Sequence, residues 1–162
     1  TVRSNLGHQI TVFSNDHVGD KIARHGMYEK ENLDLLLALL RLMEKPVVLD
    51  IGANIGNHTL AFATAAAQVH AFEPVPAIFA LLEQNVRQNN LGHVAVHNLA
   101  LSDLEGSDTI YMVQDGNFGA SSFDKRSDAV LPVTVLKVTG DAWLARAQVP
   151  KIDLVKNRCG SS

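Results

Sequence analysis

Apolar residues recur at helical spacing in the first quarter of the chain, which predicts a helix over residues 29–44. Leu35 and Leu39 widen the apolar stripe, so we expect this helix to be well buried. Pro46 ends it, because proline lacks the backbone N–H that a helix interior needs. Before the helix, the loose alternation of residues 8–14 predicts a short strand. The residues that set the helical spacing are Leu33, Leu36, Leu37, Leu40 and Met43.

After residue 46, short apolar runs alternate with helical segments. Such strand–helix repeats with short connections form a parallel sheet with helices on both faces, so the chain is predicted to have an α/β fold. Leu91-Gly92 is typical of the cap that ends a helix. The predicted strands are residues 47–51, 69–72 and 94–97, and the predicted helices are residues 55–67 and 76–90.

The pattern changes again in the last third of the chain. Residues 108–113 and 131–138 predict two antiparallel strands. Their connection, residues 114–128, is polar and long for a hairpin, so we expect it to be mobile or functional. A short helix at residues 141–147 and a fourth parallel strand at residues 152–155 complete the pattern.

Composition narrows the classes of partner. The 162 residues suit a strand-and-helix extension, residues 1–45, followed by one sheet domain, residues 46–162. The net charge of -3 and the pI of about 6.1 disfavour nucleic acid, whose binding domains usually carry a basic patch. The longest apolar run, residues 35–40, is too short to span a bilayer, so no membrane partner is expected. Cys159 is the only cysteine, which excludes a disulfide framework and favours a cytoplasmic location.

The first strand of the repeat leads into a glycine loop with recognisable chemistry. Asp50 lies at the end of this strand, Gly52 and Gly56 follow in the loop, and a helix begins after them. Gly52 allows a tight turn and close approach of a ligand, and Gly56 is expected to let the helix pack close to the strand. Asn54 can adopt left-handed backbone angles and is expected to cap the helix. The next strand ends at Glu73, whose carboxylate can accept hydrogen bonds from both hydroxyls of a ribose.

The spacing of this loop indicates which nucleoside cofactor it binds. A dinucleotide fingerprint has three glycines in the pattern G-x-G-x-x-G, whereas this loop has Gly52 and Gly56 with three residues between them. Asp50 would repel a diphosphate but would favour a sulfonium or an ammonium group. We therefore predict S-adenosylmethionine rather than NAD, with a glycine turn that serves only packing as the alternative.

Three segments of the chain form a longer series, and two further segments flank it. The series is Val48-Leu49-Asp50-Ile51-Gly52-Ala53-Asn54-Ile55-Gly56, then His70-Ala71-Phe72-Glu73-Pro74, then Asn98-Leu99-Ala100-Leu101-Ser102-Asp103. The flanking segments are Tyr28-Glu29 and Thr139-Gly140-Asp141-Ala142-Trp143-Leu144 with Ile152-Asp153-Leu154-Val155-Lys156. Together they resemble the motifs of the FkbM-type S-adenosylmethionine-dependent methyltransferases, from about residue 20 to residue 156.

The resemblance implies a Rossmann-like methyltransferase fold and an enzyme that methylates a hydroxyl on a small molecule or sugar. The methionine part of the cofactor would lie in the loop, the ribose on Glu73, and the adenine near the third motif. Plain packing at a strand end is the alternative for Ala100 and Leu101. The implied cofactor-binding residues are Asp50, Gly52, Ala53, Asn54, Gly56, Asn57, Glu73, Pro74, Asn98, Ala100 and Leu101.

Other side chains are not assigned to chemistry. The catalytic base stays open. His93 and His97 lack a third ligand, so no metal site is predicted. His58 is expected to be exposed to solvent, and Trp143 is expected to be a packing residue.

The sequence departs from the family's pattern after Lys156, where an Ile-Asp-Val-Glu-Gly type segment would follow. It reads Asn157-Arg158-Cys159-Gly160-Ser161-Ser162 instead, so the methyltransferase fold is expected to be incomplete at its C-terminal end. Without the acidic segment, which could help remove a hydroxyl proton, we expect the chain to be impaired in catalysis or inactive. The fourth strand is expected to lie beside the first and to form a sheet edge that recruits a second copy of the chain, unless the hairpin covers it. Two rival functions remain: a nicotinamide-dependent oxidoreductase fragment and a non-catalytic nucleotide-binding module.

Overall fold

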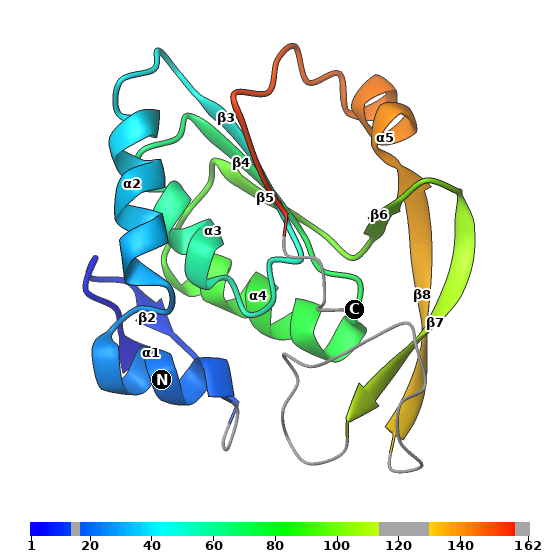
Figure 1. Ribbon diagram of the computed structural model, residues 1–162, viewed down its shortest axis with the longest axis horizontal. Helices are drawn as coiled ribbons and strands as arrows, with labels where there is room; N and C mark the ends of the chain where they lie inside the picture. Colours follow the sequence, from blue (N-terminus) through cyan, green and yellow to red (C-terminus); the bar gives the residue numbers. More distant parts are fainter. Residues whose placement is uncertain (14–16, 114–129, 158–162) are drawn as a thin grey trace.

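A computed structural model describes residues 1–13, 17–113 and 130–157 (Figure 1). The connection predicted at residues 114–128 and the thiol of Cys159 lie outside the described residues. The central sheet has four parallel strands in the order β5-β4-β3-β9. These strands are β3 (Val47–Ile51), β4 (Gln68–Phe72), β5 (Val94–His97) and β9 (Leu154–Asn157).

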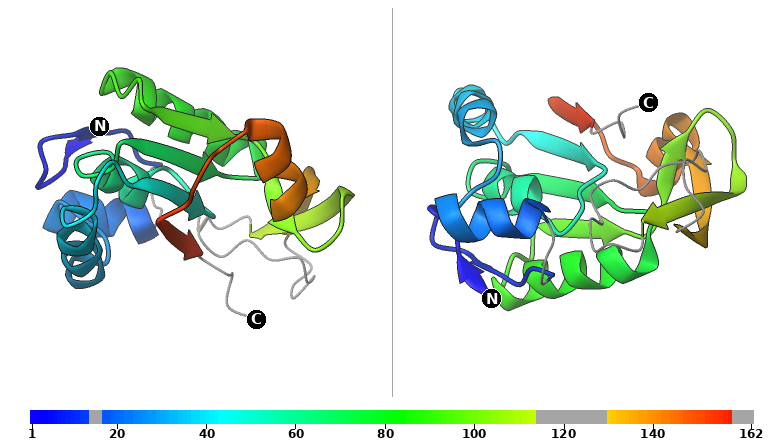
Figure 2. Two further views of the ribbon diagram at one scale, coloured as in Figure 1. Left: turned by 90° about the horizontal axis from the view of Figure 1, so that it is seen from above. Right: turned by 60° about the horizontal axis from the view of Figure 1, so that its bottom comes forward.

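Helices cover both faces of this sheet, as predicted. Residues of α2 (Lys30–Leu40), α3 (Asn57–Phe62) and α4 (Pro76–Gln88) pack with one face of the strands. Helix α5 (Gly140–Ala147) packs with the other face through Trp143, and it is drawn in orange, apart from those helices, in Figure 2. This arrangement confirms the α/β fold class.

Alternation along the strands builds a separate core on each face. Val48 and Val69 lie side by side in β3 and β4 and pack with the buried leucines of α2 and with Phe62 of α3. The next residue of β3, Leu49, points to the other face and packs with Trp143 of α5. The strands are apolar on both faces because both faces are covered.

A second, three-stranded sheet lies beside the first. It consists of β6 (Ala100–Ser102), β8 (Val130–Thr139) and β7 (Gly106–Val113), in that order. The antiparallel pairing of β7 with β8 confirms the predicted hairpin. Strand β6, which pairs parallel with β8, was not predicted, because three residues carry no measurable periodicity.

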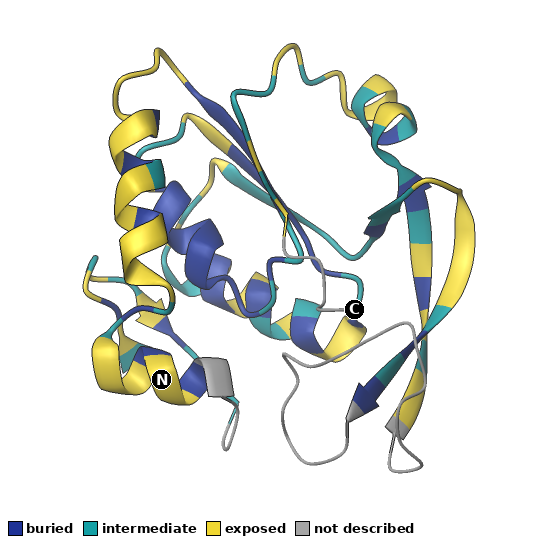
Figure 3. Ribbon diagram, viewed as in Figure 1, coloured by how far each residue is buried: buried dark blue, intermediate teal, exposed yellow. Residues whose placement is uncertain are grey.

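Several boundaries and exposures differ from the sequence prediction. Leu35 is 63% exposed and Leu39 is 44% exposed, so the expectation that α2 is well buried was wrong (Figure 3). The helix rests on the sheet through one narrow face, and its outer leucines point away from it. Helix α3 is shorter than predicted, and β9 begins two residues later than the predicted strand at residue 152. At the end of α4, Asn90 rather than Gly92 adopts a left-handed conformation.

The N-terminal segment joins the same core. A two-stranded hairpin of β1 (Val2–Arg3) and β2 (Gln9–Ile10) is followed by α1 (His17–His25), which was not predicted. Ile10 and Ile22 are fully buried and share a cluster with Leu82 of α4. The boundary proposed at residue 45 stays a prediction. Within the described ranges, no helix has the length and apolar character needed to cross a membrane.

Strand β9 forms one edge of the central sheet, next to β3, as predicted. In the part of the chain that the structure describes, β9 pairs only with β3, and the hairpin joins the other sheet. Val155 on this strand is 53% exposed. Association of two copies through this edge stays a prediction.

Candidate cofactor site

The loop between β3 and α3 holds three residues in the left-handed region of backbone space. They are Gly52 (φ 69°), Asn54 (φ 53°) and Gly56 (φ 96°). A Cβ added to Gly56 would lie 2.8 Å from Cδ1 of Leu82. The close approach that requires this glycine is therefore to α4, and the expected approach to the strand was wrong.

Asn54 supports the loop in a different way from the one predicted. Its Oδ1 accepts a hydrogen bond from the backbone N–H of Ile55 at 2.7 Å. The N-cap of α3 is Gly56, and no side chain among the described residues caps this helix. Asn54 thus tolerates the predicted left-handed conformation but stabilises the turn before the helix, so the expectation that it caps α3 was wrong.

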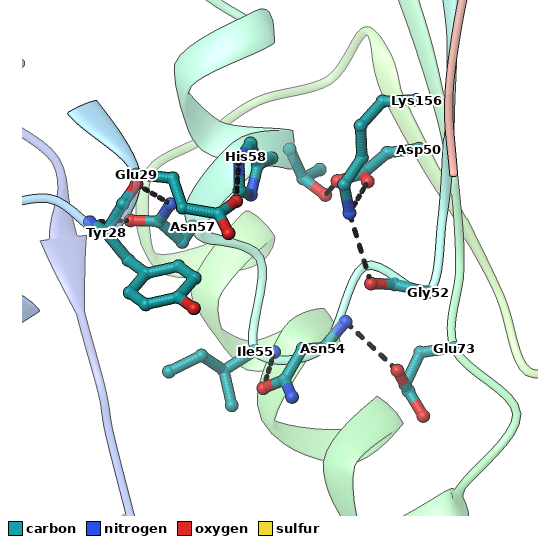
Figure 4. Close-up of polar contacts among 11 residues, drawn as sticks. Tyr28, Glu29, Asp50, Gly52, Asn54, Ile55, Asn57, His58, Glu73 and Lys156 are labelled. Carbon is teal, nitrogen blue, oxygen red and sulfur yellow. Dashed lines mark hydrogen bonds and ion pairs between the residues drawn. The ribbon is translucent and has the colours of Figure 1, made fainter. Parts of the chain in front are cut away.

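Glu73 lies directly after β4 and faces the glycine loop (Figure 4). Its Oε2 accepts a hydrogen bond from the backbone N–H of Asn54, and its Oε1 accepts one from Val75, each at 3.0 Å. The residue is only 5% exposed. Burial raises the pKa of Glu73 to about 7, although the two backbone donors oppose this rise.

Asn98 connects the ends of β4 and β5. Its Nδ2 donates to the carbonyl oxygens of Glu73 and Pro74, each at 2.9 Å. Ala100 and Leu101 follow in β6, where Ala100 is buried and Leu101 packs against the cluster around Trp143. Asn98 is therefore held against Glu73, whereas Ala100 and Leu101 occupy packing positions, as the packing alternative expects.

Asp50 is fully buried and already has two partners. Thr59 donates its hydroxyl to Oδ2 at 2.6 Å, and Lys156 places Nζ 2.9 Å from Oδ1. Lys156 also donates to the carbonyl oxygen of Gly52 at 3.3 Å. The sequence predicted that the Asp50 carboxylate attracts a cationic cofactor. In the structure, Lys156 already neutralises this carboxylate.

Thr59 and Lys156 were not predicted as site residues. The signal for Lys156 was present in the expected sheet order. Once β9 lies beside β3 in parallel register, Lys156 falls directly opposite Asp50. The signal for Thr59 was weaker, because it depends on how α3 packs over the strand.

The corner that precedes α2 is joined to the start of α3. The side chain of Asn57 accepts from the backbone N–H of Tyr28 at 3.1 Å and donates to the carbonyl oxygen of Tyr28 at 3.0 Å. Glu29 places Oε2 3.3 Å from Nε2 of His58. His58 is 7% exposed, so the expectation that it faces solvent was wrong.

Two pockets meet at this corner. One, of about 570 Å³, is lined by Glu29, Asn32, Leu35, Leu36, His58, Lys156 and Asn157. The other, of about 500 Å³, lies between α1 and α2 and shares Glu29 and Asn32 with the first. Lys156 lines the first pocket and also donates a hydrogen bond to Gly52 of the glycine loop, so it lies between the two.

An aromatic cluster lies on the opposite face of the sheet. Trp143 is buried and forms T-shaped contacts with His70, Phe72 and His97, which confirms the expected packing role. His70 Nδ1 and His97 Nε2 lie 3.2 Å apart. Burial, with help from His70, lowers the pKa of His97 to about 4. Among the described residues, no group of three potential ligands could hold a metal ion.

The glycine loop, Glu73, the third motif and the flanking segments from residue 139 lie within one match to a known family, and Tyr28-Glu29 lies outside it. A model of the Methyltransferase FkbM domain matches residues 50–156, which is more than half of the chain. The chain belongs to the FkbM methyltransferase domain family. This match confirms the family predicted from the motifs.

Solved structures resemble parts of this FkbM domain. The YcgJ protein of Bacillus subtilis matches with a TM-score of 0.40 and 19% identity, over 43% of this chain and 30% of its own. A SAM-dependent methyltransferase from Agrobacterium tumefaciens matches with a TM-score of 0.40 and 16% identity, over 43% of this chain and 23% of its own. The tRNA (m1A58) methyltransferase TrmI of Aquifex aeolicus matches with a TM-score of 0.42 and 24% identity, over 52% and 37%.

These matches span less than half the length of each solved protein, so the family assignment rests on the match to residues 50–156. No curated protein matches the chain.

Proposed function

We propose that this FkbM domain binds S-adenosylmethionine along the glycine loop and Glu73, and that it serves methyl transfer to a hydroxyl of a small molecule or sugar. The observation that carries the proposal is the position and state of Glu73. Its carboxylate is buried, lies at the end of β4 beside the loop, and has a pKa raised to about 7.

The chemistry of Glu73 fits a ribose. A buried carboxylate is stabilised in its charged form by hydrogen-bond donors, and the two backbone donors present leave the pKa of Glu73 high. Each carboxylate oxygen can accept a second hydrogen bond. The two hydroxyls of a ribose would supply these donors, and an adenosine-containing ligand would therefore stabilise the ionised side chain.

The other residues of the site act by shape. The left-handed angles at Gly52 and Gly56 bring the backbone of the loop to the carboxyl ends of the strands, where α/β sheets bind ligands. Asn98 fixes the backbone at Glu73 and Pro74. When bound, S-adenosylmethionine supplies an electrophilic methyl group on a sulfonium. The role of the protein is then to align an acceptor with that group.

Calorimetric titration tests the cofactor assignment. We expect S-adenosylmethionine to bind and NAD not to bind. Glu73→Ala should weaken S-adenosylmethionine binding by about tenfold or more, since it removes a charged hydrogen-bond acceptor. Glu83→Ala is the matched control, because Glu83 is an exposed carboxylate on α4, and this variant should bind as the unaltered chain does. Equal binding by all three proteins would contradict the assignment of Glu73.

The acceptor is tested separately, by formation of S-adenosylhomocysteine. The net charge of -3 supports a small or sugar hydroxyl acceptor over RNA. We expect turnover with hydroxylated small molecules and none with RNA. Cofactor binding without turnover on any acceptor would favour the non-catalytic nucleotide-binding module instead.

A further inference from the structure

A cationic ligand in the glycine loop needs an anionic partner, and Asp50 is already neutralised. Asp50 is fully buried and its two oxygens face Thr59 and Lys156. A second ammonium group placed there would have to displace Lys156 or lie beside its positive charge. The partner for the amino-acid end of a cofactor must therefore come from elsewhere in the site.

Glu29 offers a carboxylate in the right place. Its side chain is 40% exposed and lines the pocket of about 570 Å³ that Lys156 and His58 also line. Among the described residues that line this pocket, Glu29 is the only acidic one. In Figure 4 it lies on the opposite side of His58 from the Lys156–Asp50 pair. The pocket thus extends from Lys156, which contacts the glycine loop, to Glu29.

The backbone at Glu29 is held in an uncommon conformation. Its φ of 54° and ψ of 44° place it in the left-handed region, which disfavours a side chain of this kind. Strained positions persist only where the surroundings enforce them, and they gather at ligand sites. Asn57 enforces this one, because its buried side chain holds both backbone groups of Tyr28.

Asn57 and His58 follow the glycine loop directly, so the loop itself positions Glu29. Asn57 is fixed through Tyr28, and Nε2 of His58 lies 3.3 Å from the Glu29 carboxylate. The corner, the pocket and the loop therefore form one connected structure.

We propose that Glu29 binds the ammonium group at the amino-acid end of S-adenosylmethionine, in the pocket between α2, α3 and β9. This inference rests on the proposed function and extends it to a residue from the N-terminal segment. Lys156 then screens Asp50 and separates it from the ligand, and Glu29 provides the charge that recognises the ligand's amine.

Two ligands, two variants of Glu29 and one control variant test the proposal by calorimetry. S-Adenosylmethionine carries the amino-acid end, whereas 5′-methylthioadenosine keeps adenine, ribose and sulfur but lacks it. We expect Glu29→Gln to lower the affinity for S-adenosylmethionine by about tenfold, the usual size of a lost charged hydrogen bond. The affinity for 5′-methylthioadenosine should stay within about twofold, because that ligand has no ammonium group for Glu29 to bind.

The control is Glu31→Gln. Glu31 lies in the first turn of α2 and lines the neighbouring pocket of about 500 Å³. It is not among the described residues that line the pocket of about 570 Å³. This variant should bind both ligands as the unaltered chain does. A second variant, Glu29→Asn, guards against misfolding, because asparagine tolerates left-handed angles. It should fold with the same or higher thermal midpoint and show the same selective loss.

Three results would overturn the proposal. Equal losses for both ligands would show that Glu29 only supports the structure. Unchanged affinity for S-adenosylmethionine would mean that another group binds the amine. A loss in Glu31→Gln equal to that in Glu29→Gln would indicate a general effect of surface charge. If the unaltered chain binds neither ligand, the proposed function fails instead.

Discussion

Lys156 and Asp50 lie opposite each other in neighbouring parallel strands, with Nζ of the lysine 2.9 Å from Oδ1 of the aspartate. The aspartate is fully buried and the lysine side chain is 13% exposed. Since Lys156 also donates to the carbonyl oxygen of Gly52, this pair connects β9 to the glycine loop. It supports the site by neutralising a charge that the fold buries beneath the loop.

Removal of the lysine should therefore be costly. In Lys156→Met, Asp50 keeps its hydrogen bond from Thr59 but loses its only described cationic partner, and we expect the free energy of unfolding to fall by about 3 to 5 kcal/mol. Urea denaturation measures this change. The control is Lys137→Met, which breaks a pair with the exposed Asp108 and should lower the free energy of unfolding much less, because solvent screens that pair. Equal losses in both variants would show that Asp50 does not depend on Lys156.

The pKa of Glu73 predicts opposite effects of pH on cofactor binding and on stability. Ribose donors favour the ionised carboxylate, so affinity for S-adenosylmethionine should rise by about tenfold between pH 6 and pH 8. Without ligand, a pKa raised from 4.5 to about 7 stabilises the protein below pH 4.5, and this contribution is lost as pH rises through 7. Titrations and urea denaturation across this range measure both trends. Glu73→Gln should flatten each of them, and parallel slopes in the variant would exclude Glu73 as their source.

Gly56 should resist substitution for two reasons. Its φ of 96° disfavours any side chain, and a Cβ would lie 2.8 Å from Cδ1 of Leu82. We expect Gly56→Ala to lower the free energy of unfolding by about 2 to 3 kcal/mol. Gly92→Ala is the matched control, because a Cβ there meets nothing within 4 Å, and it should change stability by about 0.5 kcal/mol or less. Thermal denaturation of both variants checks the difference.

His97 should make the protein sensitive to acid. Its pKa is lowered to about 4 in the fold, whereas an unfolded histidine titrates near 6.5. Its contribution to stability is therefore present above pH 6.5 and is lost as pH falls towards 4, by roughly 2 kcal/mol after allowance for partial exposure. His97→Phe keeps an aromatic ring against Phe72 and Trp143 but cannot titrate. On acidification, the free energy of unfolding of His97→Phe should therefore rise relative to that of the unaltered protein. A difference between the two proteins that does not change with pH would contradict this.

The elements predicted best are those whose burial leaves a pattern in a single segment. Strands β3, β4 and β5 appear as apolar runs because helices cover both faces of the sheet. Helix α1 has little apolar character, and Ile22 is its one large side chain described as buried, so its pattern resembles that of a loop. The exposure of Leu35 was missed because periodicity alone does not show how wide a face the sheet covers.

The sequence predicted only those parts of the candidate site whose residues lie in one continuous segment of the chain. The glycine loop and Glu73 were found because each residue follows its own strand. The pairing of Lys156 with Asp50 and of Glu29 with His58 joins segments far apart in the chain, and it depends on register and helix packing. Such contacts become visible only when the fold brings the segments together.

The bonds between Asn57 and Tyr28 have a consequence for how the molecule comes apart. A fragment that begins at residue 46 would keep the whole central sheet but would leave the buried amide of Asn57 without the backbone groups it binds here. The first forty-five residues therefore stabilise the start of α3. We expect the slowest-exchanging amide hydrogens to include that of Tyr28 along with those of the central strands. In the binding mode proposed above, loosening of this segment would release the amino-acid end of the ligand first, and the nucleoside only when the sheet itself opens.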